Sequence, residues 1–112
     1  MRDSAKSGAL TEVTFFILLS LYAPNHGYGI MKFVEEKSKG RLILGAGTLY
    51  GAIKTLAKRN WIMPVDDGNA RKKEYIITNL GKSIADEELT RLKELSMIAE
   101  VIIGEGNVKS FV

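Results

Sequence analysis

Apolar residues recur along this chain at helical spacing in four stretches and in a strand-like pattern in one region. The first stretch, residues 13–23 (VTFFILLSLYA), is apolar on every side, which is typical of a helix buried all round. We expect this helix to begin near Ser7 and to end before the Pro24-Asn25 break. Its 11 or so apolar residues fall well short of the ~20 that span a bilayer, so we expect no membrane anchor. A cleaved secretory signal is the alternative, but acidic residues interrupt the preceding segment and no clear cleavage site follows.

Two shorter amphipathic helices are predicted next. The second helix opens at His26-Gly27-Tyr28, and Gly40 is well placed to end it. Its apolar face carries Ile30, Phe33 and Val34. After a short connector, a third helix is expected over residues 46–59, with Asn60 as its stop. The apolar face of the third helix carries Leu49, Ala52, Ile53 and Leu56.

The region after the third helix reads as a β-hairpin. Two β-favouring runs, residues 61–65 and 71–78, flank the turn-rich sequence Asp-Asp-Gly-Asn at 66–69. Because Pro64 has no N–H to donate to a ladder, the first of these strands should be an edge strand.

A long final helix completes the pattern. Thr78 is a good N-cap residue for a helix over residues 79–103, and the glycine-rich residues 104–112 are expected to form a flexible tail. The fold class is therefore predicted to be mainly α with a small β-hairpin.

The composition narrows the chemistry that this chain can perform. The chain has 112 residues, enough for one domain with one core, with no cysteine and a single histidine, His26. Disulfides, thiolate metal sites and cysteine nucleophiles are excluded, and no second imidazole is present for a zinc site. We expect no enzyme activity, no metal and no cofactor, and we expect His26 to have a structural role near the start of the second helix.

The charge is unevenly distributed along the chain. The net charge is +3, but residues 1–82 hold 13 Lys and Arg against 7 Asp and Glu, whereas residues 83–112 hold 3 against 6. Residues 41–82 alone carry 8 basic and 3 acidic residues. Any surface that meets a polyanion should therefore be built from residues 41–82 and not from the acidic end.

The outer face of the third helix changes character along its length. It begins with the small residues Gly47, Thr48 and Gly51 and continues with the basic residues Lys54, Lys58 and Arg59. A helix that enters the DNA major groove by its N-terminal end needs small side chains near the base edges and cations near the phosphates. The alternative is an ordinary solvated face whose glycines reflect tight packing.

The predicted hairpin carries a run of three cations. Arg71, Lys72 and Lys73 follow the turn and could lie along a phosphate backbone. The alternative is a solvated charge run, because Asp66 and Asp67 on the other strand reduce the local potential.

The final helix has more apolar surface than one small domain can cover. Leu92, Leu95, Ala99 and Ile102 follow one another at spacings of 3, 4 and 3. Met97, Ile98 and Val101 lie beside this stripe. We therefore predict a dimer interface formed by Leu92, Leu95, Ala99 and Ile102 with a second copy of the chain.

Three segments, "HGYGI", "GTLYGAIKTLAKRNWI" and "RKKEYIITNLGK", resemble in order and spacing the PadR family of bacterial transcription regulators. The similarity covers roughly residues 8–103. It implies a winged helix-turn-helix DNA-binding domain over residues 1–78 and a dimerisation helix over 79–103.

The resemblance also implies which residues contact DNA. The recognition helix would span residues 46–59 and include Thr48, Tyr50, Lys54 and Lys58. The wing would span residues 66–73 and include Arg71, Lys72 and Lys73. Tyr28 would lie near the phosphates. The chain departs from the family at Gly45-Ala46, often Ser-Pro, and at Glu74, often tyrosine.

The pattern and the resemblance together predict a cytoplasmic homodimer that binds double-stranded DNA at an inverted repeat and regulates transcription, most simply as a repressor. In this interpretation Gly51 faces the groove between Thr48 and Lys54. The resemblance also implies that a small-molecule effector could bind between the first and last helices, although its identity cannot be read from the sequence. The alternative function is a winged-helix protein-interaction module that does not bind DNA.

Overall fold

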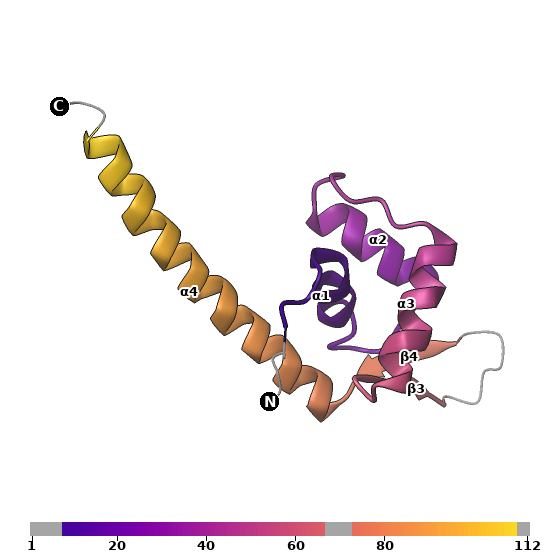
Figure 1. Ribbon diagram of the computed structural model, residues 1–112. Helices are drawn as coiled ribbons and strands as arrows, with labels where there is room; N and C mark the ends of the chain where they lie inside the picture. The colour runs from indigo at the N-terminus through magenta and orange to yellow at the C-terminus, as the bar shows by residue number, and fades with distance from the viewer. Residues whose placement is uncertain (1–7, 67–72, 110–112) are drawn as a thin grey trace. The chain divides into compact units, whose positions relative to one another are not determined.

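The computed structural model describes residues 8–66 and 73–109 of the chain (Figure 1). Its elements in order are α1 (Glu12–Leu19), β2 (Asn25–His26), α2 (Gly27–Lys37), α3 (Ala46–Lys58), β3 (Ile62–Val65), β4 (Glu74–Ile77) and α4 (Asn79–Lys109). Three short helices, a hairpin and a long final helix are the elements of a winged helix-turn-helix, so the expected fold class is confirmed. The chain divides into two compact units, of which one is Leu10–Ala85 and the other contains α4 from Asp86 onward.

One hydrophobic core holds the Leu10–Ala85 unit together. Its fully buried side chains come from α1 and the turn after it, from α2, from α3 and from the sheet. The largest are Ile17, Leu18, Leu21, Ile30, Val34, Leu49 and Ile62. Burying each such side chain stabilises the fold by about 1.5–3 kcal/mol. Because α3 contributes to this core, its apolar side is fixed inward and its other side is free to face solvent.

Helix α1 is shorter and less enclosed than the sequence pattern predicts. It begins at Glu12 and not near Ser7, because the Thr11 side chain caps it by accepting a hydrogen bond from the Thr14 N–H at 3.1 Å. Burial all round is also wrong, since Leu19 keeps 37% of its surface exposed. A domain this small covers only part of a helix perimeter, and hydrophobicity alone does not say which part. No helix in the described parts of the chain is long and apolar enough to cross a membrane.

The ends of α2 and α3 follow the predicted stop signals closely. Gly40 adopts a positive φ of 78° after α2, and its N–H donates to the Glu35 carbonyl at 2.8 Å. Asn60 adopts a positive φ of 64° after α3. Lys39, next to Gly40, also has a positive φ of 57°. The chain therefore reverses at left-handed positions after both helices, close to the residues that the sequence indicated.

The sheet has three strands in the order β2-β4-β3, all antiparallel. Strand β3 lies at the edge with Pro64 opposite Tyr75, which confirms the edge position predicted from the proline. Strand β2 was not predicted: Asn25 and His26 pair with Tyr75 and Glu74. Two residues carry no recognisable alternation, so only the three-dimensional structure reveals this strand.

Helix α4 starts where predicted and extends further than predicted. Thr78 caps it, with its hydroxyl accepting the Gly81 N–H at 3.0 Å. The helix continues to Lys109, six residues beyond the expected end at Ile103, so residues 104–109 are helical and not the start of a tail. Glycine inside a helix costs only about 1 kcal/mol relative to alanine, which does not stop a long helix that contains no proline.

Candidate nucleic-acid interface

Helix α3 presents two contrasting sides. Leu49, Ile53 and Leu56 are buried with 4% or less of their surface exposed. The opposite side is exposed and consists of Gly47, Thr48, Gly51, Lys54, Thr55 and Lys58. The predicted orientation of the helix is therefore confirmed, and small residues followed by cations form one continuous exposed strip.

Gly51 lies in the middle of this strip with open space above it. A Cβ atom added at Gly51 would meet no other atom of the described residues within 4 Å, and the same holds at Gly47. Neither glycine is therefore required by packing within the part of the chain that the structure describes. Their effect is to expose the helix backbone, which allows another molecule to approach α3 closely.

Gly51 and Gly81 both lie in helices, but Gly51 has open space above it and Gly81 is closely packed, so the two positions give a matched stability test. Alanine at Gly51 should raise the free energy of unfolding by about 0.5–1 kcal/mol, since it adds helix propensity without a clash. Alanine at Gly81 should lower it by about 1–3 kcal/mol, because the new Cβ would lie 2.1 Å from the backbone carbonyl oxygen of Trp61. Urea unfolding of both variants measures the two changes. An unstable Gly51→Ala variant would contradict the open position of this glycine.

Tyr50 connects α3 to the start of α2. A Cβ at the buried Gly27 would lie 2.5 Å from the Tyr50 hydroxyl oxygen, so a larger residue at this position would require the Tyr50 ring to move. Tyr50 nevertheless keeps 56% of its surface exposed. The side chain therefore positions α3 against α2 and also remains available for an external contact. The sequence pattern places Tyr50 on the recognition helix but does not predict its packing on Gly27, for which the glycine in "HGYG" is a local signal.

The start of α2 is held by a small polar network. The His26 Nδ1 accepts the Gly29 N–H at 3.3 Å, and Asn25 Oδ1 accepts the His26 N–H at 2.9 Å. A Cβ at Gly29 would lie 2.0 Å from Asn25 Oδ1. These contacts confirm the structural role predicted for His26 and explain both glycines of "HGYGI". They also position Tyr28, which stacks on the His26 ring at 6.5 Å between centroids and keeps 68% of its surface exposed.

The predicted wing is only partly described by the structure. Arg71 and Lys72 lie outside the described residues, whereas Lys73 is exposed immediately before β4. Glu74, the departure from the family pattern, pairs with Val65 on one side and with His26 on the other. Strand β4 of the hairpin thus pairs directly with His26, the residue that caps α2.

The basic residues between positions 41 and 82 differ in what they contact. Within the described residues, Lys54 and Lys58 have no ion-pair partner. Arg41 donates hydrogen bonds to Glu12, one of them from Nη1 to Oε1 at 3.0 Å, and this pairing lowers the pKa of Glu12 and raises the pKa of Arg41. Arg59 lies over the Trp61 ring, 5.1 Å from its centroid. The two lysines of α3 are therefore the cations available to an anion on the exposed strip.

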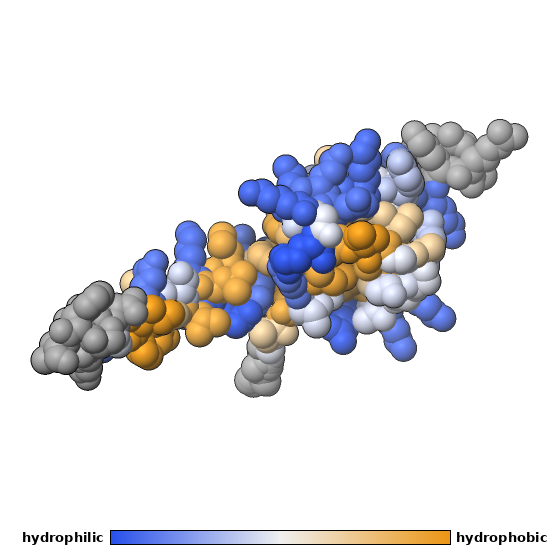
Figure 2. All heavy atoms as spheres, turned by 90° about the horizontal axis from the view of Figure 1, so that it is seen from above, coloured by the Kyte–Doolittle hydropathy of each residue, from blue (hydrophilic) through white to orange (hydrophobic). Residues whose placement is uncertain are grey.

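The second unit carries a long apolar surface on α4. Figure 2 shows hydrophobic side chains exposed along this helix. The exposed large residues from Asp86 onward are Leu89, Leu92, Leu95, Met97, Ile98, Val101, Ile102 and Ile103. They include three of the four residues predicted for the dimer interface, and the fourth, Ala99, is half-buried. Exposed apolar area of this extent is typical of a surface that binds another protein chain.

Comparison with known proteins gives a family and a set of related folds. Residues 17–87 match the model of the transcriptional regulator PadR-like family. A PadR family transcription regulator from Clostridium difficile has a TM-score of 0.68 at 20% identity, over 83% of this chain and 99% of that chain. A PadR family regulator from Eggerthella lenta has a TM-score of 0.69 at 19% identity, over 81% of this chain and 80% of that chain. At these identities the structural likeness concerns the fold.

A curated relative shares part of the sequence. An uncharacterized 37.1 kDa protein in a transposon of Streptomyces fradiae is 32% identical over 73 residues, which is 65% of this chain. The match spans only 20% of that relative's length, so it describes a shared segment and not a shared whole protein.

Proposed function

Because this chain belongs to the PadR-like family of transcriptional regulators, we propose that it binds double-stranded DNA as a homodimer and represses transcription by occupying an operator. The observation that carries this proposal is the exposed strip of α3. Its open glycines allow close approach to base edges, and Lys54 and Lys58 follow where phosphates would be met. In this proposal Thr48 and Gly51 face the bases, and the mechanism involves no chemical step.

Residues outside α3 would fix the orientation of the domain on the duplex. We assign Arg71, Lys72 and Lys73 of the wing to the phosphate backbone. Tyr28 and Tyr50 would contribute hydroxyl contacts, which their exposure of 68% and 56% permits. Phosphate contacts of this kind set register and carry little sequence information.

Dimerisation would occur through α4. The stripe of Leu92, Leu95, Ala99 and Ile102 follows the 3-4-3 spacing at which two helices pack along a seam. In this proposal residues 1–78 form the DNA-binding part and residues 79–103 the dimerisation helix, whereas the chain divides into its two compact units between Ala85 and Asp86. A two-fold axis would place two α3 helices in successive major grooves about 34 Å apart, so the operator should be an inverted repeat. Such a repressor acts on DNA in the cytoplasm of its cell.

A second candidate function is a protein-interaction module in which the apolar surface of α4 binds a different protein. The exposed leucines and isoleucines of α4 support this function as well as they support a homodimer. The cationic strip of α3, in contrast, supports only the DNA-binding function. The two functions differ in one simple property, because only the DNA-binding function gives duplex affinity that falls steeply with salt.

The salt dependence also tests the wing. Alanine at both Lys72 and Lys73 should lower affinity for every duplex sequence and reduce the log–log salt slope by about 1 for each phosphate that the variant no longer neutralises. Alanine at Lys93, an exposed residue of α4, is the control and should leave the slope unchanged. Anisotropy titrations at several salt concentrations measure both variants, and an unchanged slope in the double variant would remove the wing from the interface.

A further inference from the structure

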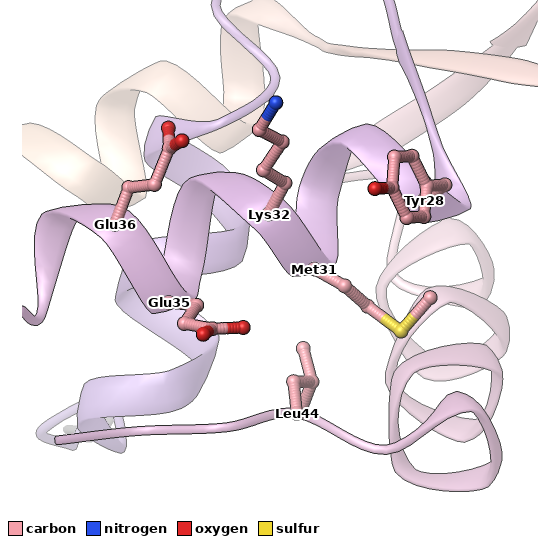
Figure 3. Close-up of a pocket in the computed structure, with 6 residues that line it drawn as sticks. All are labelled: Tyr28, Met31, Lys32, Glu35, Glu36 and Leu44. Atoms are coloured by element: carbon pink, nitrogen blue, oxygen red, sulfur yellow. The ribbon is translucent and has the colours of Figure 1, made fainter. Parts of the chain in front are cut away.

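A hollow of about 410 Å³ opens beside α2, next to the connector that leads into α3 (Figure 3). Its lining residues are Tyr28, Met31, Lys32, Glu35, Glu36 and Leu44. All belong to the Leu10–Ala85 unit, so its geometry is independent of the other unit. The volume lies within the 300–1,000 Å³ that small-molecule sites usually occupy.

The hollow is apolar at its base and aromatic at one end. Leu44, with 8% of its surface exposed, and the half-buried Met31 approach each other from the connector and from α2 (Figure 3). The Tyr28 ring lies beside Met31. These three side chains provide a thioether, an aliphatic group and a π face, which together favour a compact apolar group.

The charges around the hollow are predominantly negative. The Glu35 carboxylate is directed toward the space above Leu44, whereas Lys32 and Glu36 point away from it (Figure 3). Within the described residues Glu35 has no ion-pair partner, although Lys32 lies three positions before it on the same helix. The single carboxylate that faces the apolar base is therefore available to a cation.

We propose that this hollow binds a small lipophilic organic cation, with its apolar part on Met31 and Leu44 and its positive charge between the Tyr28 ring and the Glu35 carboxylate. An aromatic face and a carboxylate both attract a cation, and neither attracts an anion. The α2 hollow, defined by the six lining residues, would then be an effector site within each winged-helix domain.

The position of the α2 hollow gives the ligand a direct effect on DNA binding. Tyr28 belongs both to this hollow and to the phosphate-contacting residues, so this step rests on the proposed function. A ligand held against the ring would compete with DNA for Tyr28, because it would occupy the space that a phosphate needs beside this side chain. The ligand should therefore lower operator affinity and act as an inducer.

The first experiment measures binding to the full chain without DNA. Benzyltrimethylammonium is the probe, its neutral carbon isostere neopentylbenzene is the matched control, and phenylacetate is the anionic control. The cation should shift the methyl resonances of Met31 and Leu44 saturably, with an affinity about tenfold above that of the neutral isostere, because the Tyr28 ring and the Glu35 carboxylate both contribute. No saturable shift, or equal affinity for all three compounds, would overturn the site.

Two variants locate the charge that recognises the cation. Glu35→Gln should weaken binding of benzyltrimethylammonium about fivefold, while the attraction of the Tyr28 ring keeps its affinity about twofold above that of the neutral isostere. Glu36→Gln removes the same charge from a neighbouring side chain that points away from the hollow, and it should change the affinity by less than about twofold. Equal effects of the two substitutions would indicate a diffuse attraction to an acidic surface and would overturn the assignment of Glu35.

The second experiment adds DNA. Saturating benzyltrimethylammonium should lower duplex affinity of the unmodified protein, and Glu35→Gln should require about fivefold more probe for the same decrease. Filling of the hollow without any change in duplex affinity would overturn the effector role. A protein that binds the cation but binds no duplex would contradict the proposed function and leave the ligand site standing.

Discussion

Glutamate at both Leu95 and Ile102 is expected to dissociate the dimer and to reduce operator affinity about 10³-fold or more, toward the non-specific level. Each substitution would place a charge at the proposed seam, where burial of an unpaired carboxylate costs several kcal/mol. In the proposed dimer two copies together read two half-sites, so loss of the dimer and loss of operator binding should occur together. Sedimentation at micromolar concentration and a duplex titration measure the two effects.

A control with the same charge change lies on the other side of α4. Glutamate at Ser83 and Thr90, two exposed residues spaced one heptad apart, should leave the oligomeric state intact. If the Leu95→Glu, Ile102→Glu variant dissociates and the control variant does not, the result supports the proposed seam. A Leu95→Glu, Ile102→Glu variant that stays dimeric with operator affinity intact would show that another surface joins the subunits, and a monomeric unmodified protein would contradict the dimer altogether.

Glutamine at Gly51 should lower affinity for the operator about 10- to 100-fold while the protein remains folded and dimeric. The open space above Gly51 accommodates the side chain in the free protein, but the same side chain would occupy the space that a base edge needs. Titration of operator and scrambled duplexes, together with helical content by circular dichroism, separates loss of recognition from loss of fold.

Alanine at the same position is the matched control, since it adds a single carbon at the same open site. Gly51→Ala should retain most of the operator affinity, and the decrease should grow with side-chain size. Unfolding of Gly51→Gln would mean that the site is needed for packing. Full operator affinity in Gly51→Gln would mean that this side of α3 does not face the bases.

The orientation of α3 could be predicted from sequence because it depends only on the 3.6-residue period of the α-helix. Leu49, Ile53 and Leu56 fall on one side of any α-helix, so the exposed strip follows from spacing alone. The stop signals at Gly40 and Asn60 were also local, since both residues tolerate the positive φ that they adopt, whereas the positive φ of 57° at Lys39, next to Gly40, had no signal in the sequence. The strand at Asn25 and His26 depends instead on pairing with Tyr75 and Glu74, far along the chain, and has no local signature.

In the candidate site too, the features set by local sequence could be predicted, whereas the features set by contacts between distant residues could not. Exposure of Lys54 and Lys58 was predictable from helix geometry, whereas the contact of Tyr50 with Gly27 required the packing of two helices. The start of α1 and the end of α4 were misjudged because a cap at Thr11 and continuation through Gly104 are each decided by about 1 kcal/mol. Small local preferences of that size are easily outweighed or overlooked in a sequence pattern.

The most direct test of the account is selection of bound duplexes from a random pool, followed by titration of the selected sequence and a scrambled one at the same salt concentration. We expect an inverted repeat with half-sites about one helical turn apart, bound at least about 10³-fold more tightly than the scrambled duplex. Both affinities should fall as salt rises. A protein that enriches no sequence and binds neither duplex at low salt would contradict the account.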